Sequence, residues 1–456
     1  MQSLHARHAL LPSGWASDVR LQIANGRFAA VETGVAATET DEKLGIVIPG
    51  LVNAHSHAFQ RLLVGHAEQP SPDGADDFWG WRERMYRLAQ NIEPDMLYAI
   101  ACQLFCEMLT SGYTAVVEFH YLHNGPGAGI AGDDMSRAVM HAAGDSGIRL
   151  LHVPILYERS GFGSDQPGER QRLFTRTVDD LLRLYENLQQ YTSAHVALGL
   201  GVHSLRAVTP ASIDVIVQRA RADDVPFHIH VAEQQREVDE CLAATGSRPV
   251  QWLLDNHDVD HRWCLVHATH MDDDETRELA QTGAVVCLCP STEANLGDGI
   301  FPAPQYVAAG GRLAVGSDSQ VTVDPFEELR WLEYVQRLQL TRRNIIRSTE
   351  HSHSGDFLYR LALDGGAHAI GSSSGALAVD HLADLLVLDD AHPLMLGHTT
   401  DSYLDAVVFG GFATPIARVM VHGLWQVTQG EHRLAEQTRE NFATTVRRLE
   451  ARINAG

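Results

Sequence analysis

Eight short apolar runs, separated by longer segments, constrain the fold of this chain more than any other feature. The runs are rich in β-branched residues, which favour strands, and the segments between them have the apolar spacing of helices. Regular alternation of this kind is typical of an α/β protein, and eight strand–helix units predict a (β/α)8 barrel of the TIM type. The runs are residues 44–55, 114–123, 149–158, 195–204, 225–233, 262–269, 283–292 and 311–320.

Local signals place several helices between these runs. Residues 95–112 have helical periodicity and end on a glycine, which favours the C-cap position. Thr209 and Pro210 are typical of an N-cap and a first helical residue, so we expect a helix over 209–224. Residues 175–191 form a third predicted helix.

The two ends of the chain do not continue this alternation. Residues 1–48 and 376–430 contain short alternating segments that read as strands joined by turns. We expect these two pieces to form one small β-sandwich domain beside a barrel domain over 49–375. The last residues, 431–456, have the periodicity of a C-terminal helix.

Composition excludes several classes of partner. The 456-residue chain has a net charge of −23, whereas nucleic-acid binding needs clustered positive charge. No apolar run approaches the roughly 20 residues that span a membrane, and the N-terminus lacks the apolar core of a signal peptide. We therefore expect a cytoplasmic protein that binds neither nucleic acid nor membranes.

Polar side chains collect at the carboxyl ends of the predicted strands, where barrel enzymes place their active sites. His55 and His57 lie at i and i+2, so in a strand both imidazoles face the same side and can share one metal ion. His230 ends the fifth strand and Asp318 the eighth, which completes three nitrogens and one oxygen with room for a water. His228 faces the same side as His230, and we prefer His230 as the ligand because it lies nearer the strand end.

Residues suited to proton transfer accompany these ligands. Glu233 lies three residues after His230, and His267 ends the sixth strand. Together with Asp318, they are candidate catalytic groups around a metal-activated water. We expect one Zn²⁺ per chain, and Fe²⁺ or Mn²⁺ could use the same ligands.

Longer motifs reveal a family resemblance. The strings NAHSHAFQR, HIHVAEQ, LVHATHM and GSDSQ resemble the amidohydrolase superfamily, and the resemblance covers nearly the whole chain. Many members hold two metals bridged by a carboxylated lysine on the fourth strand, but Lys43 is the only lysine here. The resemblance therefore implies the one-metal subgroup, which mostly deaminates C=N carbons.

Three strings narrow the resemblance within that subgroup. NAHSHAFQR, HIHVAEQ and CPSTEANLGDGIFP together resemble the formimidoylglutamate deiminase family of bacterial histidine degradation. This implies hydrolytic deamination of N-formimino-L-glutamate to N-formyl-L-glutamate and ammonia, and a homodimeric enzyme. Since an acidic protein repels an anionic, amino-acid-derived substrate at a distance, local arginines must capture it.

The resemblance also assigns substrate contacts, and arginine is independently suited to gripping a carboxylate with two hydrogen bonds. Arg84 or Arg87 could take the place of Arg82, and the sequence does not assign either substrate carboxylate to a particular arginine. The expected contacts are Gln60, Arg82, Tyr121, His203 and Arg206.

Two other interpretations remain open from the sequence. One is another mononuclear deaminase acting on a purine, triazine or guanidino compound. The other is a non-catalytic barrel that serves as a scaffold, although such proteins typically lose metal ligands.

Overall fold

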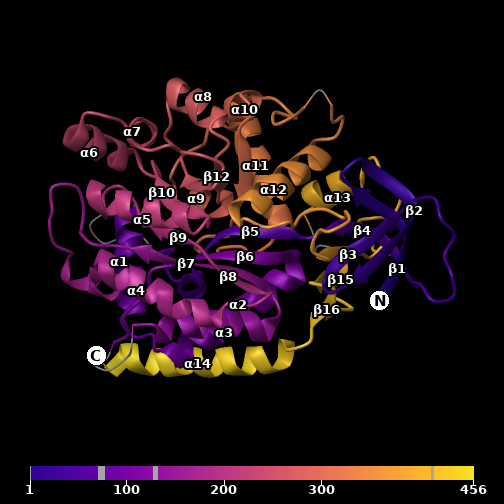
Figure 1. Cartoon of the computed structure of the whole chain (residues 1–456), viewed down its shortest axis with the longest axis horizontal. Helices are drawn as coiled ribbons and strands as arrows, with labels where there is room; N and C mark the ends of the chain where they lie inside the picture. Colours follow the sequence, from indigo (N-terminus) through magenta and orange to yellow (C-terminus); the bar gives the residue numbers. More distant parts are fainter. Residues whose placement is uncertain (1, 70–77, 127–131, 349, 412–414, 456) are drawn as a thin grey trace.

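The computed structural model describes residues 2–69, 78–126, 132–348, 350–411 and 415–455 of the chain. Its larger part is the expected barrel, and a second sheet lies at one end of the molecule (Figure 1). Within the described residues, no helix is long and apolar enough to cross a membrane. All six cysteines are buried and free.

The barrel consists of parallel strands, with the fourth position shared by two short ones. Parallel pairing runs between neighbouring positions from the first strand to the last, with both short strands pairing with the third strand, and an isolated bridge between Ser56 and Asp318 nearly closes the ring. The barrel strands are β5 (Leu51–Ser56), β6 (Tyr113–His120), β7 (Arg149–Leu156), β8 (Val196–Leu198), β9 (Leu200–Val202), β10 (Phe227–Val231), β11 (Trp263–His267), β12 (Val285–Leu288) and β13 (Arg312–Val315).

Helices surround this barrel and begin and end near the predicted signals. The side chain of Thr209 accepts a hydrogen bond from the N–H of Ser212 at the start of α5 (Pro210–Ala222). Gly112 ends α2 (Pro94–Ser111) with a positive φ of 111°, a conformation that glycine adopts without steric cost. The other helices between the barrel strands are α1 (Phe78–Ala89), α3 (Asp134–Ser146), α4 (Val178–Leu188), α6 (Gln235–Thr245), α7 (Pro249–Asn256), α8 (Asp273–Gln281), α9 (Pro290–Leu296) and α10 (Ala303–Ala308); α11 (Pro325–Leu340) and α12 (Ser354–Ala369) follow β13.

The expected β-domain is present as one continuous sheet built from both chain ends (Figure 1). Its strands pair antiparallel except for β1 and β4, which run parallel. In order across the sheet they are β17 (Glu431–His432), β16 (Leu424–Thr428), β15 (Ile416–Val421), β14 (Leu385–Leu388), β4 (Glu42–Pro49), β1 (Gln2–Leu11), β2 (Gly14–Ala24) and β3 (Arg27–Glu32). A short helix, α13 (Tyr403–Phe409), lies between β14 and β15.

The first apolar run, 44–55, differs from the expected single strand. The structure divides it between β4 of the end sheet and β5 of the barrel, with Gly50 at the junction. A Cβ at Gly50 would lie 2.2 Å from Cγ2 of Thr114, so the backbone there approaches β6 too closely for any side chain. The predicted domain limits near residues 48 and 376 stay a prediction.

The C-terminal helix, α14 (Ala435–Ala455), runs along the outside of the barrel beside α2 (Figure 1). It begins slightly later than expected because residues 431 and 432 belong to β17. Arg448 on α14 donates to Asp95 on α2 at 2.6 Å, which ties the two helices together.

Candidate metal centre and substrate cavity

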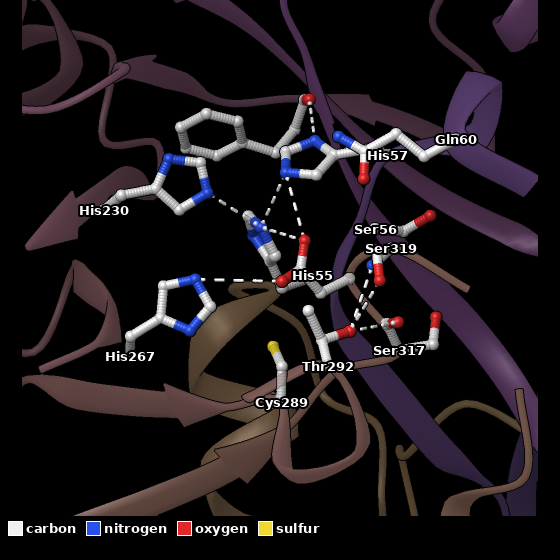
Figure 2. A network of polar contacts seen from close by, with 12 residues as sticks. His55, Ser56, His57, Gln60, His230, His267, Cys289, Thr292, Ser317 and Ser319 are labelled. Atoms are coloured by element: carbon white, nitrogen blue, oxygen red, sulfur yellow. Dashed lines mark hydrogen bonds and ion pairs between the residues drawn. The ribbon is translucent and has the colours of Figure 1, made fainter. Parts of the chain in front are cut away.

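Three imidazoles converge at the carboxyl end of the barrel (Figure 2). Nε2 of His55, on β5, lies 3.1 Å from Nε2 of His57 and 3.0 Å from Nε2 of His230, on β10. Oδ1 of Asp318 lies 3.3 Å from Nε2 of His57 and 3.6 Å from Nε2 of His55. All four side chains are buried, so water does not weaken these contacts.

Backbone carbonyls fix the tautomers of two of these rings. Nδ1 of His57 donates to the carbonyl of Phe119 at 2.9 Å, and Nδ1 of His230 donates to the carbonyl of His203 at 3.0 Å. Burial lowers the pKa of His57 to about 3 and lowers the pKa of His230 well below its ordinary value, so both rings are neutral.

The neutral rings leave Nε2 lone pairs pointing at one another beside a carboxylate. These lone pairs repel one another unless a cation lies among them. Three imidazole nitrogens and one carboxylate oxygen are ligands that suit a divalent transition metal. Nδ1 of His55 has no hydrogen-bond partner in the described part of the chain. The residues present therefore fit a mononuclear metal site.

Closure of the barrel places Asp318 beside the histidines. The N–H of Asp318 donates to the carbonyl of His55 at 3.0 Å, and the N–H of His57 donates to the carbonyl of Asp318 at 3.1 Å. Asp318 has a left-handed φ of 44°, a conformation that costs on the order of 1–3 kcal/mol in a non-glycine residue. The two backbone bonds hold this strained conformation and aim the carboxylate at the imidazoles.

His267, at the end of β11, lies among three carboxylates. Its Nδ1 is 3.2 Å from Oε1 of Glu293, and its Nε2 is 3.9 Å from Oε1 of Glu233 and 3.8 Å from Oδ2 of Asp318. Burial lowers the pKa of His267, but the carboxylates outweigh burial and raise this pKa to about 10. The ring and the two acids at Nε2 form a compact group for holding and moving protons.

Glu293 is a site residue that the sequence reasoning missed. It lies in the first turn of α9, and its Oε1 also accepts the N–H of Cys289 at 2.9 Å. The signal was present in the string CPSTEANLGDGIFP, because Pro290 after a strand is typical of a helix start at the barrel mouth. What the string does not reveal is that the carboxylate turns back towards β11.

A cavity opens from the candidate metal centre. His57, His230, Glu233, His267 and Asp318 line its inner end. The expected substrate contacts line the remainder together with apolar side chains of α1; these contacts are Gln60, Arg82, Tyr121, His203 and Arg206. Nε2 of Gln60 donates to the hydroxyl of Tyr121 at 2.8 Å.

The two cavity arginines have unused hydrogen-bonding capacity. Arg206 is 4% exposed, and its Nη1 has no hydrogen-bond partner within the described residues; the same holds for Nε of Arg82. Burial lowers the pKa of Arg206, but nearby Glu237 and Glu233 outweigh it and raise this pKa, so the guanidinium is charged. The described residues form no ion pair with either arginine at 4.0 Å or less. The cavity therefore presents two cationic donors to an anionic ligand.

Comparison with known proteins agrees with this geometry. The profile described as "Amidohydrolase family" matches residues 46–425, and the one described as "Formimidoylglutamate deiminase HutF, N-terminal domain" matches residues 1–45. The chain belongs to the amidohydrolase family.

Relatives of this amidohydrolase cover most of its length. It is 46% identical over 453 residues to formimidoylglutamate deiminase of Pseudomonas aeruginosa, covering 98% of this chain and all of the relative. It is 28% identical over 409 residues to 8-oxoguanine deaminase of the same organism, covering 86% of this chain and 85% of the relative. A crystal structure of an amidohydrolase from Brucella melitensis has 42% identity and a TM-score of 0.93, covering 98% of this chain and all of that one.

A more distant structure shows that the fold extends to proteins of low sequence identity. It is an adenosine deaminase from Xanthomonas campestris with bound zinc, at 20% identity and a TM-score of 0.81 over the whole of this chain and 99% of that one.

Buried acids outside the cavity hold the site's backbone in place. Glu118, on β6, accepts hydrogen bonds from Oγ of Ser56 at 2.8 Å and from the N–H of Ala58 at 2.7 Å, which brackets His57. Glu237, on α6, accepts the N–H of Glu233 at 3.3 Å. Sequence reasoning missed Glu118 because its contacts cross from β6 to the end of β5, and it missed Glu237 because nothing in the sequence shows that this helix residue turns back to the loop after β10.

The sequence left His228 as an alternative metal ligand, and Arg84 and Arg87 as alternative substrate contacts. All three lie away from the candidate metal centre of this amidohydrolase. Nε2 of His228 is 3.0 Å from the carbonyl of Ala369, a contact separate from the converging imidazoles. Arg84 and Arg87 line a different cavity, between α1 and α14, whereas Arg82 faces the metal side. The geometry therefore favours Arg82 over Arg84 and Arg87.

Proposed function

We propose that this amidohydrolase hydrolyses N-formimino-L-glutamate to N-formyl-L-glutamate and ammonia, the deiminase step of histidine degradation. The observation that carries the proposal is the cavity itself, which combines a mononuclear metal-type donor set with two arginines open to an anion. The relative that is 46% identical over its full length is a formimidoylglutamate deiminase, which supports the same activity.

The substrate's charges match the two ends of the cavity. N-formimino-L-glutamate carries two carboxylates and a cationic formamidine. Arg82 and Arg206 would bind the carboxylates, and Glu233 and Asp318 would face the cationic end. Anchoring the glutamate part orients the formimino carbon towards the metal centre and so supplies part of the rate.

We propose zinc as the metal, with Fe²⁺ and Mn²⁺ as alternatives that accept the same ligands. His55, His57, His230 and Asp318 would hold it, as their converging donor atoms suggest. With a divalent ion held by these residues, a water molecule at the site would be polarised and its pKa lowered towards about 7.

The chain's own residues would move the protons. Asp318 and Nε2 of His267 would orient the attacking water and take its proton; a divalent charge close by counteracts the carboxylates that raise the pKa of His267. As water adds to the formimino carbon, the proton taken from it would pass through Glu233 to the terminal nitrogen. The hydroxyl of the adduct would then lose its proton to Asp318 as the formyl C=O bond forms, the C–N bond breaks and ammonia leaves.

An activity panel would test the proposal against the other deaminase chemistries. Metal-loaded protein would be given N-formimino-L-glutamate, 8-oxoguanine, 5-methylthioadenosine and a guanidino acid, with ammonia release as the readout. We expect kcat/KM for N-formimino-L-glutamate to exceed the others by at least 10³-fold, or about 4 kcal/mol of discrimination. A purine as the best substrate would refute the proposal.

We also propose that the protein is a cytoplasmic homodimer. Light scattering coupled to size-exclusion chromatography would measure the mass of the particle, and 50.1 kDa would indicate a monomer. Cell fractionation of the native source would test the location.

A further inference from the structure

The indole ring of Trp79, in the first turn of α1, lies close to three guanidinium groups. The Cζ atom of Arg82 is 4.2 Å from the ring centroid, that of Arg236 is 4.5 Å away, and that of Arg206 is 5.3 Å away. Arg82 belongs to the same helix, Arg206 follows β9, and Arg236 is the second residue of α6. One aromatic ring thus connects three separate elements around the substrate cavity.

Arg82 and Arg206 line the cavity, whereas Arg236 is exposed and its Nε donates to Glu240 at 2.6 Å, so the contacts of Arg82 and Arg206 are the ones that matter for the site. The face of an indole is electron-rich and attracts a guanidinium within about 6 Å of its centroid, more strongly when the pair is desolvated. Arg206 is 4% exposed, and within the described residues neither it nor Arg82 forms an ion pair. Among carboxylates, Glu237 contributes most to raising the pKa of Arg206, and Glu237 also accepts the N–H groups of Ala232 and Glu233.

Two cations that face one cavity also repel each other. Each guanidinium also lies over a second ring, Arg82 over Tyr86 at 5.5 Å and Arg206 over Phe78 at 5.7 Å, but Trp79 is the ring that both share. Trp79 offers both of them a common anchor without using up their N–H groups, because a π face binds the cation and leaves the donors at its edge available.

We propose that Trp79 is a positioning residue for substrate binding, which holds the guanidiniums of Arg82 and Arg206 ready for the two carboxylates of the substrate. The inference rests on the proposed function and extends it to specificity. A clamp made of two pre-oriented arginines selects short aliphatic dicarboxylates, and a ligand with one carboxylate or none cannot use the second arginine.

The test compares Trp79→Leu with Trp79→Phe, using the metal-loaded full chain. Trp331→Leu is the matched control, since Trp331 lies on the surface of α11 with 37% exposure and does not line the cavity. We expect Trp79→Leu to raise KM for N-formimino-L-glutamate by about 10-fold or more with kcat changed less than 3-fold, because pre-organisation acts on binding. Trp79→Phe should recover part of the loss, and Trp331→Leu should match the wild type.

Two further measurements separate positioning from a general structural effect. Turnover of a neutral-tailed formamidine without carboxylates should be the same in wild type and Trp79→Leu. Combining Trp79→Leu with Arg206→Met should give a loss smaller than the product of the single losses, since Trp79 acts through that arginine. Equal losses on both substrates, or independent losses in the double variant, would overturn the inference.

Binding of glutarate separates this inference from the proposed function. Titration calorimetry would measure the Kd of glutarate, a plain dicarboxylate, for wild type and both Trp79 variants. A roughly 10-fold weaker Kd in Trp79→Leu supports the clamp even if N-formimino-L-glutamate is no substrate, and an unchanged Kd refutes it. Should Trp79→Leu not fold, as judged by thermal melting, Trp79→Phe and Trp79→His carry the same comparison.

Discussion

Glu293 and His267 form a buried hydrogen-bonded pair, with Oε1 of the acid 3.2 Å from Nδ1 of the ring. The same carboxylate oxygen accepts the N–H of Cys289 at 2.9 Å, so its position is fixed by the backbone. Because Nδ1 is held from behind, Nε2 is aimed at Glu233 and Asp318. An orienting acid behind a catalytic histidine fixes both the tautomer and the ring plane.

Glu293→Gln should therefore impair the reaction while leaving the metal bound. We expect kcat to fall by roughly 10- to 100-fold, the range for losing a partner that orients a functional histidine. Steady-state kinetics and metal analysis would measure the two effects. Glu278→Gln, an exposed glutamate on α8, is the matched control and should behave as wild type. Loss of metal in Glu293→Gln would contradict an orienting role.

Glu233→Gln keeps the shape of the side chain but removes its proton-transfer capacity. We expect kcat to fall by at least about 10²-fold, the usual scale for losing a general acid or base, with metal content unchanged. Near-normal turnover of this variant would remove Glu233 from the mechanism.

Much of this site could be predicted from the sequence, because the carboxyl ends of the strands of a barrel meet at one face. The pattern predicted that His55, His57, His230 and Asp318 would come together, and the structure places their donor atoms within contact distance. The sequence predicted that the two chain ends form one domain, but it did not predict which strands pair. The two ends meet where β4 pairs with β14, and no local signal specifies the register between strands more than 300 residues apart.

The roles of the buried acids Glu118 and Glu293 could not be predicted from their positions along the strands. Glu118 on β6 contacts Ser56 at the end of β5 and Ala58 just after it, and Glu293 turns back from α9 towards β11. A glutamate in a strand or helix most often faces solvent, so only the three-dimensional packing identifies these two as buried. The division of the run at Gly50 was missed for a related reason, since the close approach to Thr114 is a tertiary contact.

Arg206→Met should weaken recognition of the dianionic substrate in particular. Loss of one partner from a buried charged pair at a binding site typically costs about 2–5 kcal/mol, so we expect kcat/KM to fall by roughly 30-fold or more. Arg206→Lys should recover only part of this loss, because lysine restores the charge without the two-pronged geometry. Assays with a formamidine lacking carboxylates provide the comparison. Equal losses on both substrates would mean that Arg206 only stabilises the cavity.

The donor set predicts one divalent metal per chain. Elemental analysis of metal-loaded protein should give one equivalent, and His230→Ala should lose most of it. His228→Ala is the matched control, and it should retain metal because Nε2 of His228 contacts the carbonyl of Ala369. Two equivalents in the wild type, or metal loss in His228→Ala, would contradict this ligand assignment.

Glu118 should make folding stability depend on pH. Burial raises its pKa from 4.5 to about 8, so between these values the folded protein keeps a proton that the unfolded chain releases. The contribution of Glu118 to the free energy of unfolding is therefore fully present below pH 4.5 and is lost as the pH rises towards 8. This contribution changes by at most about 1.4 kcal/mol per pH unit.

Urea unfolding of metal-loaded wild type and Glu118→Gln at several pH values between 5 and 8 would measure this contribution. The difference in unfolding free energy between the two proteins should change in favour of the variant as pH rises. A difference that is constant across this range would show that Glu118 does not take up a proton on folding.

The most direct test of the account is product analysis with N-formimino-L-glutamate. Hydrolysis can break either C–N bond of the formamidine, and the two outcomes differ in their products. Proton NMR of the reaction, with ammonia measured in parallel, should show N-formyl-L-glutamate and ammonia formed in equal amounts, as expected if Glu233 protonates the terminal nitrogen. Formation of L-glutamate and formamide, or no turnover by metal-loaded protein, would contradict the account.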